Sequence, residues 1–77
     1  MEEIVLRNEF IKLGQALKAA GLVESGVDAK IEISEGQVKV NGKVEIQRGK
    51  KLYSGDIVEF NGNEIKIINS DKGSYDN

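Results

Sequence analysis

The stretch that decides the fold reads E-G-Q-V-K-V-N-G-K-V at residues 35–44, and it is followed by R-G-K-K-L-Y-S-G-D at residues 48–56. Around Asn41-Gly42 the valines alternate with polar residues, which is the two-residue period of half-buried strands. Asparagine followed by glycine favours a tight hairpin turn, because both residues accept the positive φ that such a turn needs. The stretch therefore predicts a β-hairpin in the middle of the chain.

The register of this hairpin can be predicted from its apolar residues. A two-residue turn would place Val40 opposite Lys43, so that charge would lie across from the apolar face. A three-residue loop would instead pair Val40 with Val44. The same register would pair Val38 with Ile46. Since a slip of one residue turns every side chain to the other face, we predict the three-residue loop, or strands that pair elsewhere.

Before the hairpin, the apolar residues follow a helical period. They recur at i, i+3, i+7 and i+10 and form one stripe, made by Phe10, Leu13, Leu17 and Ala20. Asn8 is placed to cap the start of a helix, and Gly21 to end it. We therefore predict a helix near residues 9–20. Ile11 lies opposite the stripe, where we expect it to pack under a neighbouring strand.

A second helix is predicted near residues 26–35. Ser25 and Asp28 have the spacing of a capping box, which satisfies free backbone donors at the start of a helix. Gly36 is expected to end it. The apolar side chains fall on two sides of this helix, so we expect it to be covered on both. One side carries Ala29 and Ile33, and the other carries Val27 and Ile31.

The rest of the chain predicts strands. A strand over residues 57–60 is followed by Asn61-Gly62 and by a last strand over residues 64–68. A two-residue turn fits this hairpin, because it pairs Val58 with Ile65. Ile4 to Leu6 resemble a short additional strand.

These elements predict one domain over residues 1–68, with a polar tail at 69–77 that we expect to be disordered. The fold class is α+β: a two-helix hairpin followed by a small β-rich half, with a short N-terminal strand. The acidic N-terminus does not resemble a signal peptide, and no run approaches the roughly 20 apolar residues of a membrane span. We expect a cytoplasmic protein that is monomeric and has no membrane partner.

Composition argues against an enzyme. The 77 residues include no cysteine and no histidine, so the commonest general base, metal ligand and thiol nucleophile are missing. Glu32 and Glu35 lie three residues apart on the second helix, a spacing shared by many solvated surface pairs. The glycines are spread through turns rather than gathered in a phosphate-binding loop. We therefore expect no catalysis, no metal and no cofactor.

The positive charge is concentrated in the middle of the chain. Although the net charge is −2, residues 37–51 hold five basic side chains against one acidic, a balance of +4. Such a cluster can neutralise phosphates and release counterions. Solvated lysines that deter edge-to-edge aggregation are the structural alternative. Tyr53 is the one ring near the cluster placed to stack on a base, because Phe10 and Phe60 are expected in the core.

The chain resembles a known family in the combination of E-G-x-V-x-V-N-G-K-V with R-x-x-K-L-x-x-G-D. Leu13, Leu17, Gly21 and Leu22, which precede this combination, add to the resemblance. The chain is similar to the RNA-binding domain first seen in ribosomal small-subunit protein four, the alpha-L RNA-binding motif. The form is most similar to that of stand-alone bacterial YaaA/YbcJ-type members. The resemblance covers about residues 10–60.

This resemblance implies a surface, made by the helix hairpin and the following β-turn, that binds folded RNA. The implied partner is ribosomal or transfer RNA, and a ribonucleoprotein is a further expected partner. Carried over by position, the implied contacts are Lys12, Lys30, Gln37, Lys39, Asn41, Lys43, Arg48, Lys50 and Lys51. The implied core residues are Leu13, Leu17, Ala29, Ile33, Val38 and Val40. They agree with the periodicity.

Two departures from the family pattern weaken the helical half of this surface. Larger members often begin the first helix with Arg-Leu-Asp, where this chain has Lys12-Leu13-Gly14. They also tend to have arginines early in the second helix, where this chain has Val27 and Asp28. The alternative is therefore a protein-interaction adaptor in a ribonucleoprotein that keeps the fold but binds RNA weakly or not at all.

Overall fold

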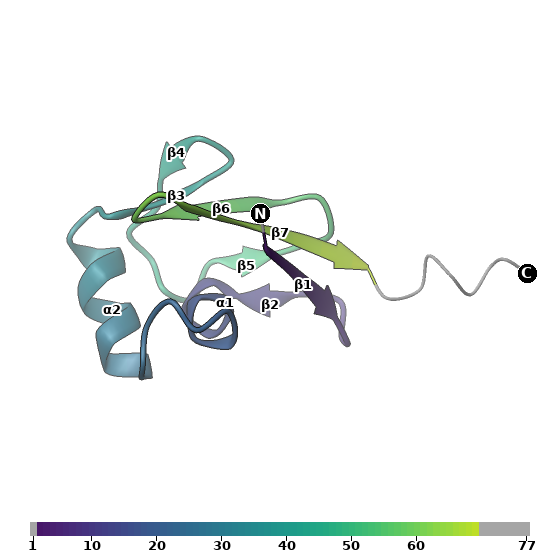
Figure 1. Cartoon of the computed structure of the whole chain (residues 1–77), viewed down its shortest axis with the longest axis horizontal. Helices are drawn as coiled ribbons and strands as arrows, with labels where there is room; N and C mark the ends of the chain where they lie inside the picture. The colour runs from purple at the N-terminus through teal and green to yellow at the C-terminus, as the bar shows by residue number, and fades with distance from the viewer. Residues whose placement is uncertain (1, 70–77) are drawn as a thin grey trace, which may run out of the picture.

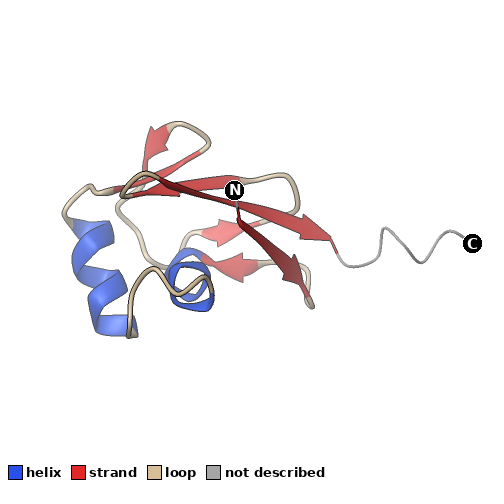
Figure 2. Ribbon diagram, viewed as in Figure 1, coloured by secondary structure: helices blue, strands red, loops and turns tan. Residues whose placement is uncertain are grey.

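The computed structural model describes residues 2–69. Within these residues the chain forms seven strands and two helices, shown in Figures 1 and 2. In chain order they are β1 (Glu2–Leu6), β2 (Ile11–Lys12), α1 (Leu13–Ala19), α2 (Gly26–Ser34), β3 (Val38–Val40), β4 (Lys43–Val44), β5 (Lys51–Leu52), β6 (Ile57–Phe60) and β7 (Asn63–Asn69). The α+β class with a two-helix hairpin, a β-rich half and an N-terminal strand is confirmed.

Five strands form one sheet in the order β1-β7-β6-β3-β4, and β2 pairs with β5 in a separate two-stranded ribbon. The pairing of β1 with β7 is parallel, so the first and last strands of the described chain lie side by side. Both helices and the β2–β5 ribbon lie on the same side of the five-stranded sheet (Figure 1). The other side of the sheet is left open.

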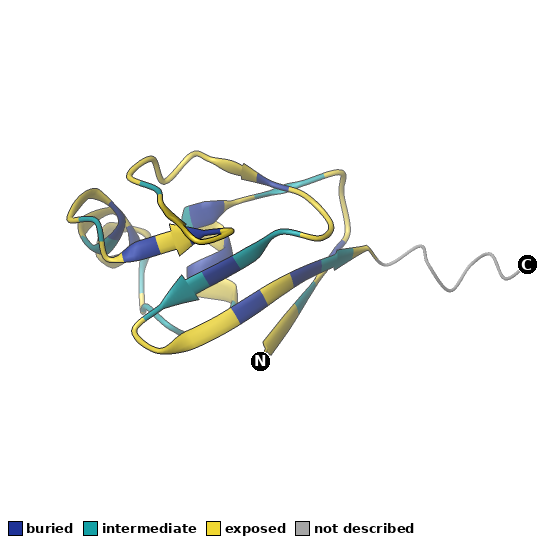
Figure 3. Ribbon diagram, turned by 90° about the horizontal axis from the view of Figure 1, so that it is seen from above, coloured by how far each residue is buried: buried dark blue, intermediate teal, exposed yellow. Residues whose placement is uncertain are grey.

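The core lies between the sheet and the layer formed by the helices and the ribbon. Buried and exposed residues alternate along the central strands, as Figure 3 shows. All six core residues implied by the family resemblance are buried. The full set of buried hydrophobic residues is Leu6, Leu13, Ala16, Leu17, Ala29, Ile33, Val38, Val40, Leu52, Val58, Ile65 and Ile67.

The first helix begins later than predicted, and Asn8 does not cap it. Its N-cap is Lys12, whose side chain makes no capping hydrogen bond. The free backbone donors of the first turn are satisfied from elsewhere: Leu13 N donates to Lys50 O at 2.9 Å, and Gly14 N donates to Arg48 O at 3.0 Å. Residues 11–12 are extended because they pair with β5. The sequence period could not reveal this, since the carbonyls that cap the helix lie over thirty residues away.

The end of α1 agrees with prediction, because Gly21 follows the helix with a φ of +75°. The start of α2 agrees as well. Ser25 is its N-cap and accepts a hydrogen bond from Asp28 N at 3.2 Å.

The prediction that α2 is covered on two sides is wrong. Ala29 and Ile33 are buried, but Val27 and Ile31 are exposed. The reason is that α2 lies at the end of the layer, where a single sheet face and α1 are its neighbours (Figure 1).

The three-residue loop predicted for the central hairpin is also wrong. Asn41 and Gly42 form a two-residue turn with φ values of +53° and +86°, and Val40 pairs with Lys43. Val38 and Val40 pair with apolar residues on β6 instead. This agrees with the alternative prediction, that the strands pair elsewhere. Val44 is left exposed at the sheet edge.

The second hairpin has the predicted register, with a two-residue turn at Asn61-Gly62 and Val58 opposite Ile65. The last strand is slightly longer than predicted and ends at Asn69. The rest of the predicted disordered tail, residues 70–77, lies outside the described residues. No helix within the described part of the chain is long and apolar enough to span a membrane.

Candidate nucleic-acid interface

The loop over residues 47–50 lies across the start of α1. The two hydrogen bonds from Leu13 N and Gly14 N fix it there, and Lys50 N closes the loop by donating to Gln47 O at 3.1 Å. The backbone of Arg48 is so close that a Cβ on Gly14 would lie 3.5 Å from the Cβ of Arg48. The loop thus brings Arg48 to the start of α1, and the strand that follows it places Lys51 opposite Lys12.

A groove of about 320 Å³ runs between this loop, α1 and the start of α2. We call it the basic groove; it is lined by Lys12, Gly14, Gln15, Lys18, Gly26, Arg48 and Gly49. Three of these seven residues are cationic, and none is a carboxylate. A concave surface lined by one sign of charge raises the local potential and attracts anions such as phosphates.

Two lysines carry positive charge along the helices, one inside the basic groove and one beyond it. Lys18 follows Gly14 by four residues and lines the same groove from the last turn of α1. Lys30 is exposed and follows Gly26 by four residues, which places it one turn further along the same side of α2. Lys18 was missed as a candidate contact, although its helical spacing from Gly14 was visible in the sequence.

Lys12 and Lys51 lie directly opposite each other in the β2–β5 ribbon. Like charges at such positions destabilise a strand pair. Their neighbours Ile11 and Leu52 turn toward the core, so both lysines lie on the outer face of the ribbon. A cost in stability at this position favours a binding role for the two ammonium groups.

Phe10 does not lie in the core as predicted. It is half-buried, and its ring packs against Tyr53, with 6.0 Å between ring centroids and an interplanar angle of 53°. The Lys51 ammonium lies 4.8 Å from the centroid of the Phe10 ring. The prediction failed because residue 10 precedes β2 rather than belonging to α1, so the helical stripe does not include it.

The central hairpin divides its lysines between two faces. Lys43 lies opposite Val40, whose side chain is in the core, so Lys43 belongs to the side of the sheet that carries the helices. Lys39 alternates with Val40 and therefore lies on the open side, opposite Glu59 on β6. The structure does not place Lys39 with the basic groove.

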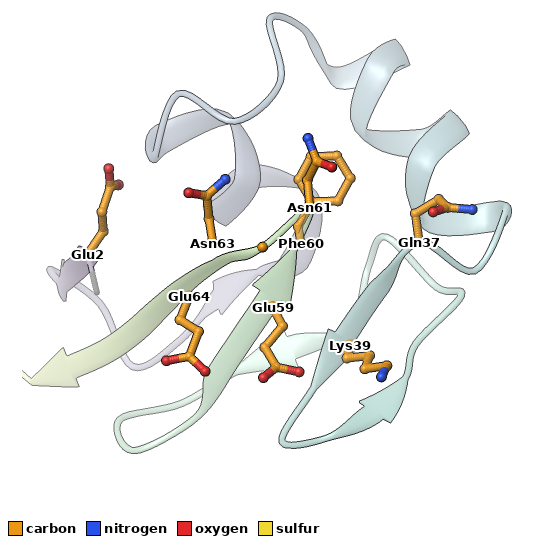
Figure 4. A pocket seen from close by; sticks show the side chains of 9 residues that line it. Glu2, Gln37, Lys39, Glu59, Phe60, Asn61, Asn63 and Glu64 are labelled. Carbon is orange, nitrogen blue, oxygen red and sulfur yellow. The ribbon is translucent and has the colours of Figure 1, made fainter.

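Gln37 also lies outside the basic groove. It lines a hollow at the β6–β7 turn together with Lys39, seen in Figure 4. Glu59 and Glu64 extend from the same side of the sheet there, and Glu2 completes the acidic lining. With three carboxylates and one cation, this hollow is a poor site for a phosphate backbone.

Asn41 has a structural role. Its Nδ2 donates to Asp56 Oδ1 at 3.0 Å, and its Oδ1 accepts from Ile57 N at 2.9 Å. The other carboxylate oxygen of Asp56 accepts from Tyr53 N at 2.7 Å. Asn41 and Asp56 thus join the turn after β3 to the segment between β5 and β6.

Comparison with known proteins places this geometry in a family. The family model of the S4 domain matches residues 4–68. A protein of Bacillus subtilis (strain 168) named "Probable ribosome maturation protein RlbA" is 43% identical over 67 residues, which is 86% of this chain and 94% of that protein. YbcJ of Escherichia coli (strain K12) is 40% identical over 62 residues, which is 80% of this chain and 89% of that protein.

The fold is also similar to a solved structure. The solution structure of YbcJ from E. coli, described as revealing an alpha-L motif involved in RNA binding, matches with a TM-score of 0.69 and 39% identity, over 88% of this chain and 87% of that chain. The resemblance drawn from the sequence is confirmed. The chain belongs to the S4 domain family and has the fold of its alpha-L RNA-binding members.

Proposed function

We propose that this protein binds structured RNA through the basic groove and the outer face of the β2–β5 ribbon, without catalysis. The observation that carries the proposal is the convergence of Lys12, Lys18 and Arg48 on a groove with no carboxylate in its lining. Nucleic acids are bound first through their phosphates, and this lining supplies cations without an opposing charge.

Folded RNA fits this surface better than an extended single strand. The groove is short and rigidly built, since backbone hydrogen bonds from α1 hold its loop. Proteins that bind single strands without sequence preference line a long channel with several aromatic rings, whereas this surface has one aromatic pair. Recognition of shape and phosphate positions is the mode expected for structured RNA.

Ribosomal RNA is our first choice of ligand, and transfer RNA the second. The relative from B. subtilis carries ribosome maturation in its name, and the match covers nearly all of that protein. A role in the cytoplasm, within a ribonucleoprotein, follows from this choice.

The test is a comparison of ligands. Binding of the protein to a ribosomal RNA fragment, a transfer RNA, a blunt RNA duplex and a DNA duplex of the same sequence is measured at 50 and 200 mM salt. We expect the folded RNAs to bind more tightly than the DNA duplex. Four neutralised phosphates would weaken binding on the order of a hundredfold between the two salt concentrations. Equal, weak binding of all four ligands would contradict the proposal.

A protein adaptor is the second candidate, favoured by one observation. Val27 and Ile31 lie four residues apart on α2, and their side chains are 67% and 46% exposed. Apolar side chains at this spacing on an uncovered helix are suited to a protein partner. Under this alternative, RNA binding would be weak throughout, and Val27→Ser with Ile31→Ser would release the protein from ribosomal particles while Lys12→Gln would not.

A further inference from the structure

The outer face of the β2–β5 ribbon carries two pairs of side chains in one register. Lys12 lies opposite Lys51, and the same antiparallel register brings Phe10 opposite Tyr53. Ile11 and Leu52, which alternate with these four residues, pack toward the core. We call the set Phe10, Lys12, Lys51 and Tyr53 the ribbon platform.

The Tyr53 ring is exposed and yet held in place. Its side chain is 45% exposed, while its backbone N–H donates to Asp56 Oδ2 at 2.7 Å. On one side the ring packs against Phe10. An exposed ring with a fixed backbone can accept a stacked base at little cost in conformational entropy.

The Lys51 ammonium is held by a ring rather than left free. It lies 4.8 Å from the centroid of Phe10, within the range of a cation–π interaction. This contact holds a positive charge on Phe10, the ring that packs against Tyr53. A nucleotide offers both of the matching groups, since its base stacks on a ring and its phosphate pairs with an ammonium group.

The ribbon platform is continuous with the basic groove, because Lys12 belongs to both. Phosphates bound along the groove would therefore bring the next nucleotide to the rings. A base inside a duplex is stacked between its neighbours and cannot lie on a protein ring, so the nucleotide at the platform has to be unpaired.

Resting on the proposed function, we infer that the ribbon platform binds one unpaired nucleotide of the RNA, whose base stacks on Tyr53 and whose phosphate is held by Lys12 and Lys51. The ligand of this protein is then an RNA helix interrupted or ended by an unpaired base, such as a bulge or an overhang. This inference assigns Phe10 and Tyr53 to RNA binding.

The fluorescence of Tyr53 gives a direct test. The chain has two tyrosines and no tryptophan, so the variant Tyr75→Phe leaves Tyr53 as its single tyrosine. This variant is titrated with three RNAs that share one sequence: a blunt duplex, the duplex with a one-nucleotide bulge, and the duplex with a 3′ overhang. We expect the bulge or overhang RNA to quench Tyr53 fluorescence strongly and to bind about tenfold more tightly than the blunt duplex.

The variant Tyr53→Leu, checked for folding by circular dichroism, should lose the preference for unpaired RNA and bind all three RNAs like the blunt duplex. The variant Tyr53→Phe keeps an aromatic ring and should keep the preference. If Tyr53→Leu retains the preference, or if the unpaired RNAs do not quench the fluorescence, the platform is not a nucleotide site although RNA binding stands. If none of the RNAs binds, the proposed function fails as well.

Discussion

The side-chain amide of Asn41 donates a hydrogen bond to the carboxylate of Asp56 across fifteen residues of sequence. The same amide accepts a hydrogen bond from Ile57 N, and the same carboxylate accepts one from Tyr53 N. Two short turns, N-G and G-D, are thereby fastened to each other. The spacing between these turns is thus a requirement of the fold. Asp56 also accepts a hydrogen bond from the backbone of Tyr53, which belongs to the ribbon platform.

We predict that Asn41→Ala lowers the free energy of unfolding by about 1–3 kcal/mol, because Ile57 N and the Asp56 carboxylate lose a partner. Asn61→Ala is the matched control. Asn61 also precedes glycine in a two-residue turn, with a φ of +55° against +53° at Asn41, but it makes no comparable side-chain bond within the described residues. Urea unfolding of both variants measures the difference. Equal losses would mean that backbone conformation, not the bond to Asp56, sets the cost.

Gly42→Val should destabilise the protein by more than about 1 kcal/mol, because a β-branched residue is strained at a φ of +86°. Nothing lies within 4 Å of a Cβ at this position, so the Cβ itself meets no neighbouring atom and the strain is in the backbone. Gly49→Ala is the control, since Gly49 also has open space around it but no positive φ. A midpoint of urea unfolding unchanged by Gly42→Val would contradict the assignment of a strained turn.

Lys12→Gln should have opposite effects on stability and on RNA binding. Removing one of two directly opposed lysines should raise the free energy of unfolding by a few tenths of a kcal/mol. It should also weaken RNA binding, since Lys12 is shared by the basic groove and the ribbon platform. Lys66→Gln is the control: Lys66 lies opposite Glu3 on the open side of the sheet, and its loss should not stabilise the protein or change RNA affinity. A loss of stability in Lys12→Gln would show that the lysine pair is not a cost to the fold.

Much of the fold could be predicted from local sequence. Periodicity and the cap at Ser25 located α2, and Asn61-Gly62 located the last hairpin, because these signals lie within a few residues of the structure they determine. The start of α1 could not be predicted in this way. Its cap comes from the carbonyls of Arg48 and Lys50, and a strand of two residues precedes it.

The candidate site was predicted less completely than the fold. Charge counting found the basic segment but grouped Lys39 with Arg48, although a strand of alternating residues sends Lys39 to the open side of the sheet. The apolar pattern misled in the same region, because Val40 pairs with β6 rather than with Val44. The pairing of Phe10 with Tyr53 depends on the β2–β5 ribbon. Each strand of this ribbon has only two residues, which are too few to show a period in the sequence.

We expect RNA affinity to depend on the charges of the basic groove and not on the net charge of the whole protein. The most direct measurement is the slope of log affinity against log salt for one ribosomal RNA fragment. It is taken for the natural protein, for Lys12→Gln with Arg48→Gln, and for Lys39→Gln with Lys66→Gln. Each double variant loses two positive charges, but the second pair lies on the open side of the sheet.

We predict that the first double variant binds more weakly and that its slope is smaller by about 1.8, the value for two lost phosphate contacts. For the second double variant, the slope of log affinity against log salt should equal that of the natural protein. The reason is that charges beyond about 8 Å from the bound RNA are largely screened at physiological salt. Equal slopes in the two double variants, or a natural protein whose affinity does not depend on salt, would contradict the assignment of RNA binding to the basic groove.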